Sequence, residues 1–104
     1  MNDPRWASID AFAEQNRENI LRDITRLVAV PSVEGKAAPG APFGPGPKAA
    51  LEKALEIANE LGLSTYNADS YIGWAETGAI ADGQKFLATI THTDVVPEGN
   101  GWDA

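Results

Sequence analysis

The chain has 104 residues, which is the size of one modest domain, and we expect no second domain. Apolar residues make up 43% and charged residues 22%, proportions typical of a globular rather than a disordered protein. The formal net charge of −7 argues against nucleic acid or an anionic membrane as a partner, because their phosphates would be repelled. The absence of cysteine excludes disulfides, thiolate metal sites and cysteine nucleophiles.

Two further features point to a cytoplasmic setting. Residues 1–10 lack the basic stretch and apolar core of a signal peptide. No apolar run approaches the length needed to span a membrane.

Apolar residues at helical spacing predict a first helix within residues 8–33, started by Ser8 or Asp10 and ended by Pro31. Six residues share its apolar face: Ile9, Phe12, Ile20, Ile24, Leu27 and Val28.

Four prolines and four glycines lie between Gly35 and Pro47, which excludes a helix or an inner strand there. We interpret this stretch as a long loop between two helices rather than as a linker between domains. A second helix is predicted over residues 47–62, with Pro47 in its first turn and Gly62 as a left-handed stop. Its buried stripe would consist of Leu51, Ala54, Leu55, Ala58 and Leu61.

The spacing of apolar residues then changes to that of strands. The stretches "LSTYNAD" and "YIGWAETG" predict a hairpin that turns at Asp69 and Ser70. A polar loop with a turn at Asp82 and Gly83 follows. The stretch "FLATITHTDVV" (86–96) is apolar on both faces over its first part, as in a central strand of a covered sheet. The predicted fold is therefore an α/β domain with two helices followed by three strands.

The end of this third predicted strand holds His92, which is the only histidine, and Asp94. Residues i and i+2 of a strand point to the same face, so the two side chains would project together. A neutral imidazole is a good zinc ligand, and a nearby carboxylate can orient it. The alternative is an ordinary hydrogen-bonded histidine at a strand end. Glu98 and Asp103 are further oxygen candidates, and Trp102 could wall a pocket or pack on the sheet.

The longer string "HTDVVPEGNGW" resembles the metal-binding motif of the co-catalytic zinc peptidases, a family that includes aminoacylases, carboxypeptidases and dipeptidases. "LVAVPSVEG" is similar to the first-helix exit of that family. "PFGPGPKAALEKALEIANELG" and "YIGWAETG" resemble its bacterial dipeptidase branch. Together these stretches cover about residues 20–102, in the order and spacing of the family.

The resemblance implies that residues 1–104 form the N-terminal portion of a zinc-peptidase catalytic domain, whose mixed sheet is covered by helices. His92 would be a zinc ligand, and Asp94 would be the catalytic-site carboxylate that orients it. Two zinc ions would activate water against the peptide bond of an unblocked dipeptide or small peptide. We expect the chain alone to be inactive, to bind zinc weakly and to self-associate through exposed sheet edges. The alternatives are a deacylase or desuccinylase of the same family, or a non-catalytic α/β interaction module.

Overall fold

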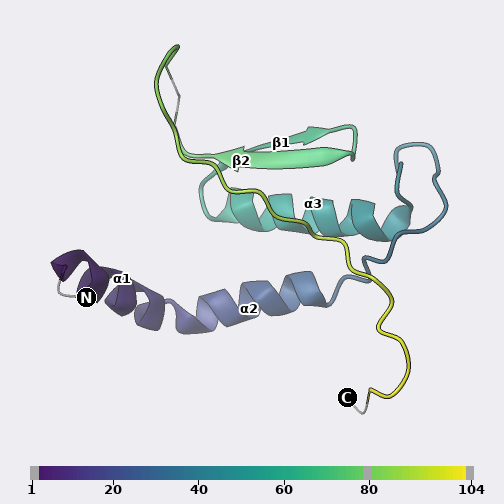
Figure 1. The fold of residues 1–104 in the computed structure, drawn as a ribbon, viewed down its shortest axis with the longest axis horizontal. Coiled ribbons are helices and arrows are strands. Elements are labelled where there is room, and N and C mark those ends of the chain that lie inside the picture. Colours follow the sequence, from purple (N-terminus) through teal and green to yellow (C-terminus); the bar gives the residue numbers. More distant parts are fainter. Residues whose placement is uncertain (1–2, 79–80, 103–104) are drawn as a thin grey trace.

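The structure is a computed structural model that describes residues 3–78 and 81–102. Over these residues the chain forms three helices followed by one two-stranded sheet (Figure 1). The elements are α1 (Pro4–Gln15), α2 (Arg17–Val28), α3 (Pro45–Glu60), β1 (Ser64–Ala68) and β2 (Ile72–Glu76). This order confirms the predicted α/β class, in which helices precede strands.

The predicted first helix is two helices, and it begins earlier than expected. The side chain of Asp3, rather than Ser8 or Asp10, caps α1 by accepting a hydrogen bond from the Arg5 backbone N–H, and Pro4 occupies the first turn. The helix breaks at Asn16, whose side-chain amide donates to the Phe12 carbonyl oxygen at 2.9 Å. That carbonyl also accepts from the Asn16 backbone, and such local side-chain bonding competes with continued helix.

The apolar side chains of α1 and α2 remain largely exposed. Phe12 is 66% exposed and Val28 78%, and neither helix contains a buried residue. The cause is visible in Figure 1, where α1 and α2 lie on the side of α3 opposite the hairpin and α1 projects beyond the end of α3. Of these two helices, α2 alone contacts α3, and α1 contacts only α2.

Helix α3 is the central element of the fold, because it contacts both strands and α2. It begins at Pro45, two residues before the predicted Pro47, after Gly44 at a φ of 94°. Gly62 has a φ of 88°, and the Leu63 N–H donates to the Ala58 carbonyl oxygen, which confirms the predicted left-handed stop. Ala50 is buried, whereas Leu61 at the end of the predicted stripe is exposed.

The predicted hairpin is confirmed. Strands β1 and β2 pair antiparallel, with Ala68 opposite Ile72. Asp69 and Ser70 both have positive φ, of 53° and 63°, and the Tyr71 N–H donates to the Ala68 carbonyl oxygen, as in a type I′ turn.

The hairpin lies close against α3 because β2 contains a glycine at the contact. A Cβ at Gly73 would lie 2.8 Å from a methyl carbon of Leu51 and 3.0 Å from one of Leu55. On the neighbouring pair, the rings of Tyr66 and Trp74 stack with centroids 5.2 Å apart. The hairpin therefore uses one face for the helix and leaves an aromatic pair on the other.

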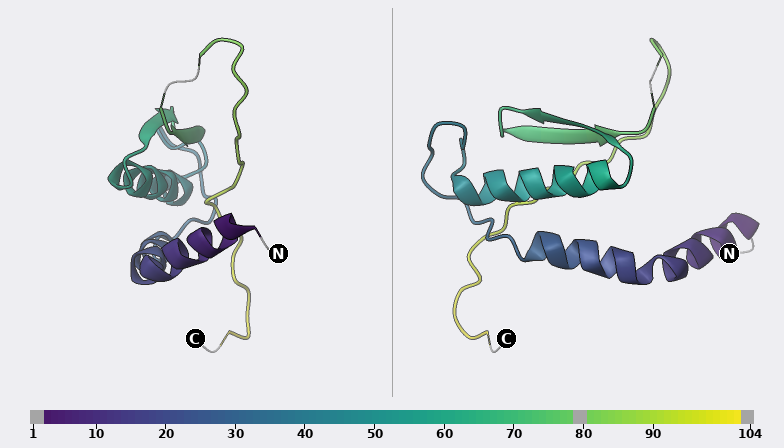
Figure 2. Two further views of the ribbon diagram at one scale, coloured as in Figure 1. Left: turned by 90° about the vertical axis from the view of Figure 1, so that its left-hand side faces the viewer. Right: turned by 180° about the vertical axis from the view of Figure 1, so that it is seen from behind.

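The predicted third strand is not part of a sheet among the described residues. Residues 85–94 form no helix or strand, and the next residue, Val95, makes a single parallel bridge with Val33. Figure 2 shows this segment descending separately from the hairpin. A central strand needs a neighbour on each edge, and β1 and β2 pair with each other instead. Leu87 and Ile90 are consequently almost fully exposed.

The described chain is open rather than compact. Its radius of gyration is 17.0 Å, against about 13 Å for a compact domain of this length. Its accessible surface is 8800 Å², against roughly 5600 Å² for a folded monomer of this mass. Within the described residues, no helix is both long enough and apolar enough to cross a membrane.

Candidate functional site

The predicted pair, His92 and Asp94, lies in the extended segment just before its bridge to the rest of the chain. The Val95 N–H donates to the Ser32 carbonyl oxygen at 3.3 Å, beside the parallel Val33–Val95 bridge. Ser32 is buried, at 4% exposure, in the loop that follows α2. The fold thus holds the candidate pair next to the loop that follows the C-terminus of α2.

His92 and Asp94 contact each other, as the spacing predicts, but through a different acceptor. The imidazole Nδ1 lies 2.8 Å from the Asp94 backbone carbonyl oxygen and 3.3 Å from its carboxylate Oδ1. A carbonyl oxygen can only accept, so the shorter contact is a hydrogen bond when Nδ1 carries the proton. The lone pair of the neutral ring is then on Nε2, which is the nitrogen that could bind a metal.

Both side chains of the pair are exposed to solvent. The His92 side chain is 80% exposed and that of Asp94 is 59% exposed. Solvent on this scale competes with the hydrogen bond and screens the charge of the carboxylate. The described residues therefore orient an imidazole without enclosing it.

The other predicted candidates do not join the pair. The Trp102 indole N–H donates to the Glu98 backbone carbonyl oxygen at 2.6 Å, so the ring folds back on its own loop and is 73% exposed. It neither walls a pocket nor packs on the sheet. Asp103 lies outside the described residues. Over residues 3–78 and 81–102, no group of three or more histidine and acidic side chains is placed to hold a metal ion.

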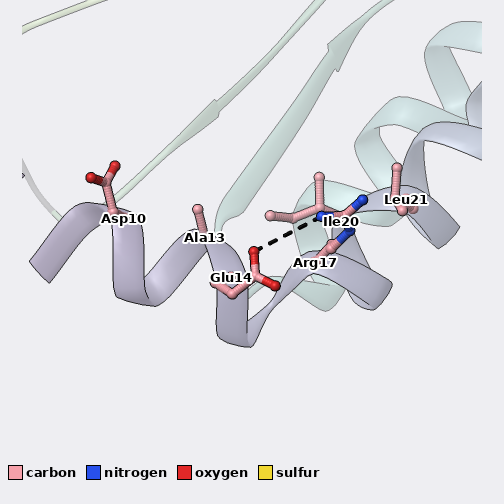
Figure 3. A pocket seen from close by; sticks show the side chains of 6 residues that line it. All are labelled: Asp10, Ala13, Glu14, Arg17, Ile20 and Leu21. Atoms are coloured by element: carbon pink, nitrogen blue, oxygen red, sulfur yellow. Dashed lines mark ion pairs between the residues drawn. The ribbon is translucent and has the colours of Figure 1, made fainter. Parts of the chain in front are cut away.

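Neither of two open hollows in the described part of the chain is lined by His92 or Asp94. One, of about 460 Å³, lies at the α1–α2 junction beside the ion pair between Glu14 and Arg17 (Figure 3). The other, of about 930 Å³, lies between the Pro/Gly loop, α3 and the hairpin turn. Lys48, Glu52 and Asp69 supply the charged side chains of this second hollow.

Two ion pairs at the helices shift the pKa values of their members. Hydrogen bonds from Arg26 lower the pKa of Glu60, and hydrogen bonds from Arg5 lower the pKa of Asp3. Both arginines have raised pKa values for the same reason. These groups stay charged at neutral pH, so they contribute to structure and not to proton transfer at His92.

Sequence reasoning missed the residues that hold the candidate pair in place. Ser32 accepts from Val95, and Gly46 lies directly against the backbone of residues 31–33. The sequence stretches involved are "PS" and "GPGP", whose prolines and glycines are typical of any loop. Their joint role depends on a contact between distant segments, so spacing alone could not reveal it.

Comparison with known proteins supports a relation to peptidases. No family model matches the chain. Over 93 residues it is 40% identical to proteins named "putative dipeptidase" from Staphylococcus aureus strains USA300, NCTC 8325 and Mu50. The chain is similar to dipeptidase-like proteins. The matched region covers 88% of this chain but 19% of each relative, so the chain spans about a fifth of the length of the curated relatives that it matches.

Proposed function

We propose that this chain forms part of a zinc-dependent dipeptidase that hydrolyses the peptide bond of unblocked dipeptides. The observation that carries the proposal is the hydrogen bond from His92 Nδ1 to the Asp94 carbonyl oxygen at 2.8 Å. It favours the tautomer in which Nε2 can bind a metal, within a string that resembles the zinc-peptidase motif. The similarity to proteins named as dipeptidases supports the same reaction class.

The residues present fit one part of a zinc site and do not complete it. A catalytic zinc takes about three protein ligands plus water, and His92 supplies one imidazole. When bound, zinc would polarise the scissile carbonyl and acidify a water molecule. His92 would hold the metal through Nε2, and Asp94 would orient the ring through its backbone carbonyl and its carboxylate. The other ligands would come from residues outside the described ranges.

The charge of Asp94 gives its carboxylate a second role in the proposal. Its Oδ1 lies 3.3 Å from Nδ1, close enough to stabilise a proton there and to raise the basicity of Nε2. The backbone carbonyl alone would orient the ring without adding charge. Removing the carboxylate should therefore weaken metal binding less than removing the imidazole.

The deciding experiment uses the complete polypeptide that contains residues 1–104, identified by reading the DNA downstream of codon 104. With zinc bound, the wild type should hydrolyse unblocked dipeptides. His92→Ala should lose zinc and activity, whereas Asp94→Asn should lose about 10- to 100-fold in metal affinity or activity. Thr91→Ala, a change at an exposed neighbour, is the matched control and should leave both unchanged.

The substrate profile separates the proposal from its alternatives. Hydrolysis of N-acetyl or N-succinyl amino acids in preference to unblocked dipeptides would reassign the protein to the deacylases. Full dipeptide hydrolysis by His92→Ala would overturn the metal role of His92. A reading frame that stops after Ala104, with a stably folded and inactive product, would favour a non-catalytic interaction module. The predicted cytoplasmic setting stays a prediction.

A further inference from the structure

The start of α3 lies unusually close to the backbone of the preceding loop. A Cβ at Gly46 would lie 2.7 Å from the Pro31 carbonyl oxygen and 3.0 Å from that of Val33. Both obstacles are backbone atoms, which cannot rotate out of the way as the end of a side chain can. Gly46 is therefore the residue that allows α3 to rest on residues 31–33.

Those same residues carry the attachment of the candidate metal-binding segment. Val33 forms the parallel bridge with Val95, and the Ser32 carbonyl oxygen accepts from the Val95 N–H. Within residues 81–102, this is the only hydrogen bond to any other described part of the chain. The position of the segment consequently depends on where the backbone of residues 31–33 lies.

The Pro/Gly loop closes around this contact and keeps it in place. The Gly35 N–H donates to the Phe43 carbonyl oxygen at 2.9 Å, and Gly44, at a φ of 94°, lies directly on the Gly35 backbone. A Cβ at Gly44 would come within 2.8 Å of Gly35 Cα. The loop thus returns the chain to residues 31–33 at the point where α3 begins. It is a closed, internally bonded loop rather than a flexible linker.

We propose that Gly46 is a positioning residue for the His92–Asp94 pair. It acts through residues 31–33, which hold Val95, and Val95 follows directly after the carbonyl that accepts from His92 Nδ1. A side chain at position 46 would displace residues 31–33 and weaken the hydrogen bond of the Val95 N–H. The His92 imidazole would then no longer be held in the tautomer that carries its proton on Nδ1. The consequence for metal binding rests on the proposed function, but the positioning itself does not.

The test is made on the metal-free 104-residue chain by nuclear magnetic resonance. Nitrogen-15 shifts of the uncharged His92 ring report which nitrogen carries the proton, and amide exchange reports the protection of Val95. The wild type should show the Nδ1–H tautomer. Gly46→Ala should shift the ring towards the Nε2–H tautomer and speed Val95 exchange by about tenfold or more.

The matched control is Gly35→Ala, in the same loop. A Cβ at Gly35 would lie 3.9 Å from its nearest neighbour, which is ordinary contact, so neither readout should change. Helix content measured by circular dichroism separates positioning from unfolding. Alanine is a better helix former than glycine, so α3 should persist in Gly46→Ala while the His92 signature is lost.

Two results would overturn the inference. The first is a folded Gly46→Ala chain with unchanged His92 tautomer and Val95 exchange. The second covers the case in which Gly46→Ala does not fold. Val95→Pro removes the Val95 N–H, and its ring favours extended backbone at Asp94. An unchanged tautomer in Val95→Pro would contradict the inference, and a shift to Nε2–H would support it. A complete polypeptide without metal-dependent hydrolysis would instead refute the proposed function and leave these results standing.

Discussion

Arg26 on α2 and Glu60 on α3 are joined by two hydrogen bonds between a guanidinium and a carboxylate. Arg26 Nη1 donates to Glu60 Oε2 at 2.6 Å, and Nη2 donates to Oε1 at 2.9 Å. Asp23 and Glu56 lie 3.1 and 3.8 Å from the same guanidinium. Because α2 buries no side chain, this cluster is its main specific connection to α3.

The Arg26–Glu60 pair predicts a dependence of stability on pH. Its hydrogen bonds lower the pKa of Glu60 below the ordinary value of 4.5, so the folded state favours the ionised carboxylate. This contribution is present above the unfolded pKa and is lost as pH falls through the lower folded pKa. The urea midpoint of the wild type should therefore fall between about pH 5 and pH 3.

Glu60→Gln should lower the midpoint at neutral pH and flatten this pH dependence. The matched control is Glu52→Gln on the same helix, whose partner Lys48 is 3.9 Å away and lies within α3. Urea titrations at several pH values, followed by circular dichroism, provide the measurement. Equal pH dependence in Glu60→Gln and the wild type would show that the pair contributes nothing.

The contact of Gly73 with α3 predicts that β2 tolerates no large residue there. Gly73→Val would push two methyl groups into Leu51 and Leu55, whose nearest atoms already lie 2.8 and 3.0 Å from an added Cβ. We expect a loss of about 1–3 kcal/mol in the free energy of unfolding, because overpacking forces strained rotamers. Ala75→Val, at an exposed position of the same strand, should be nearly neutral. Urea denaturation measures both variants, and equal effects would exclude a specific contact.

The hairpin turn carries strain that a glycine should relieve. Ser70 has a φ of 63°, a conformation that costs about 1–2 kcal/mol for residues with a Cβ. Its backbone N–H donates to Asn67 Oδ1 at 2.8 Å, a bond that a substitution of the side chain retains. Ser70→Gly should thus raise the free energy of unfolding by about 0.5–1 kcal/mol. Ser64→Gly, in β1, removes a side chain without relieving strain and should be destabilising; thermal denaturation distinguishes the two.

Features set by neighbouring residues could be predicted from the sequence. The hairpin follows from two adjacent polar residues between β-forming stretches, and Gly62 stops α3 because glycine alone adopts that φ without cost. The break at Asn16 could not be predicted, because the apolar spacing continues through it. Whether an asparagine side chain donates to a backbone carbonyl depends on its competition with the hydrogen bonds of the helix itself.

Features that depend on distant segments escaped prediction. The stretch 86–96 has the composition of a central strand, but a strand also needs partners, and composition does not say where they are. Spacing correctly placed His92 beside Asp94. It pointed to the carboxylate, because alternation describes side chains, whereas the shorter contact is to the backbone carbonyl. The close approach of Gly46 to residues 31–33 arises only when the loop closes.

The exposed apolar residues of the extended segment predict self-association. Residues 85–93 make no backbone hydrogen bond among the described residues, and Leu87 and Ile90 are 94% and 99% exposed. Such segments pair with other chains. The average mass measured by light scattering should therefore rise with concentration, and Leu87→Lys with Ile90→Lys should reduce the rise. Gln84→Lys adds charge at an exposed neighbour and should have a smaller effect. A monomer at every concentration would contradict this prediction.

The isolated 104-residue chain should bind zinc only weakly. Only one imidazole is present, and the described residues bring together no group of three or more histidine and acidic side chains, so the chelation that gives zinc sites their affinity is missing. Calorimetric titration should show weak binding, with a dissociation constant roughly in the micromolar range or above, and dipeptides should not be hydrolysed. His92→Ala should abolish the weak signal, whereas Thr91→Ala should preserve it. Tight binding of one zinc per chain would mean that other side chains move to complete the site, and binding by His92→Ala would place the metal elsewhere.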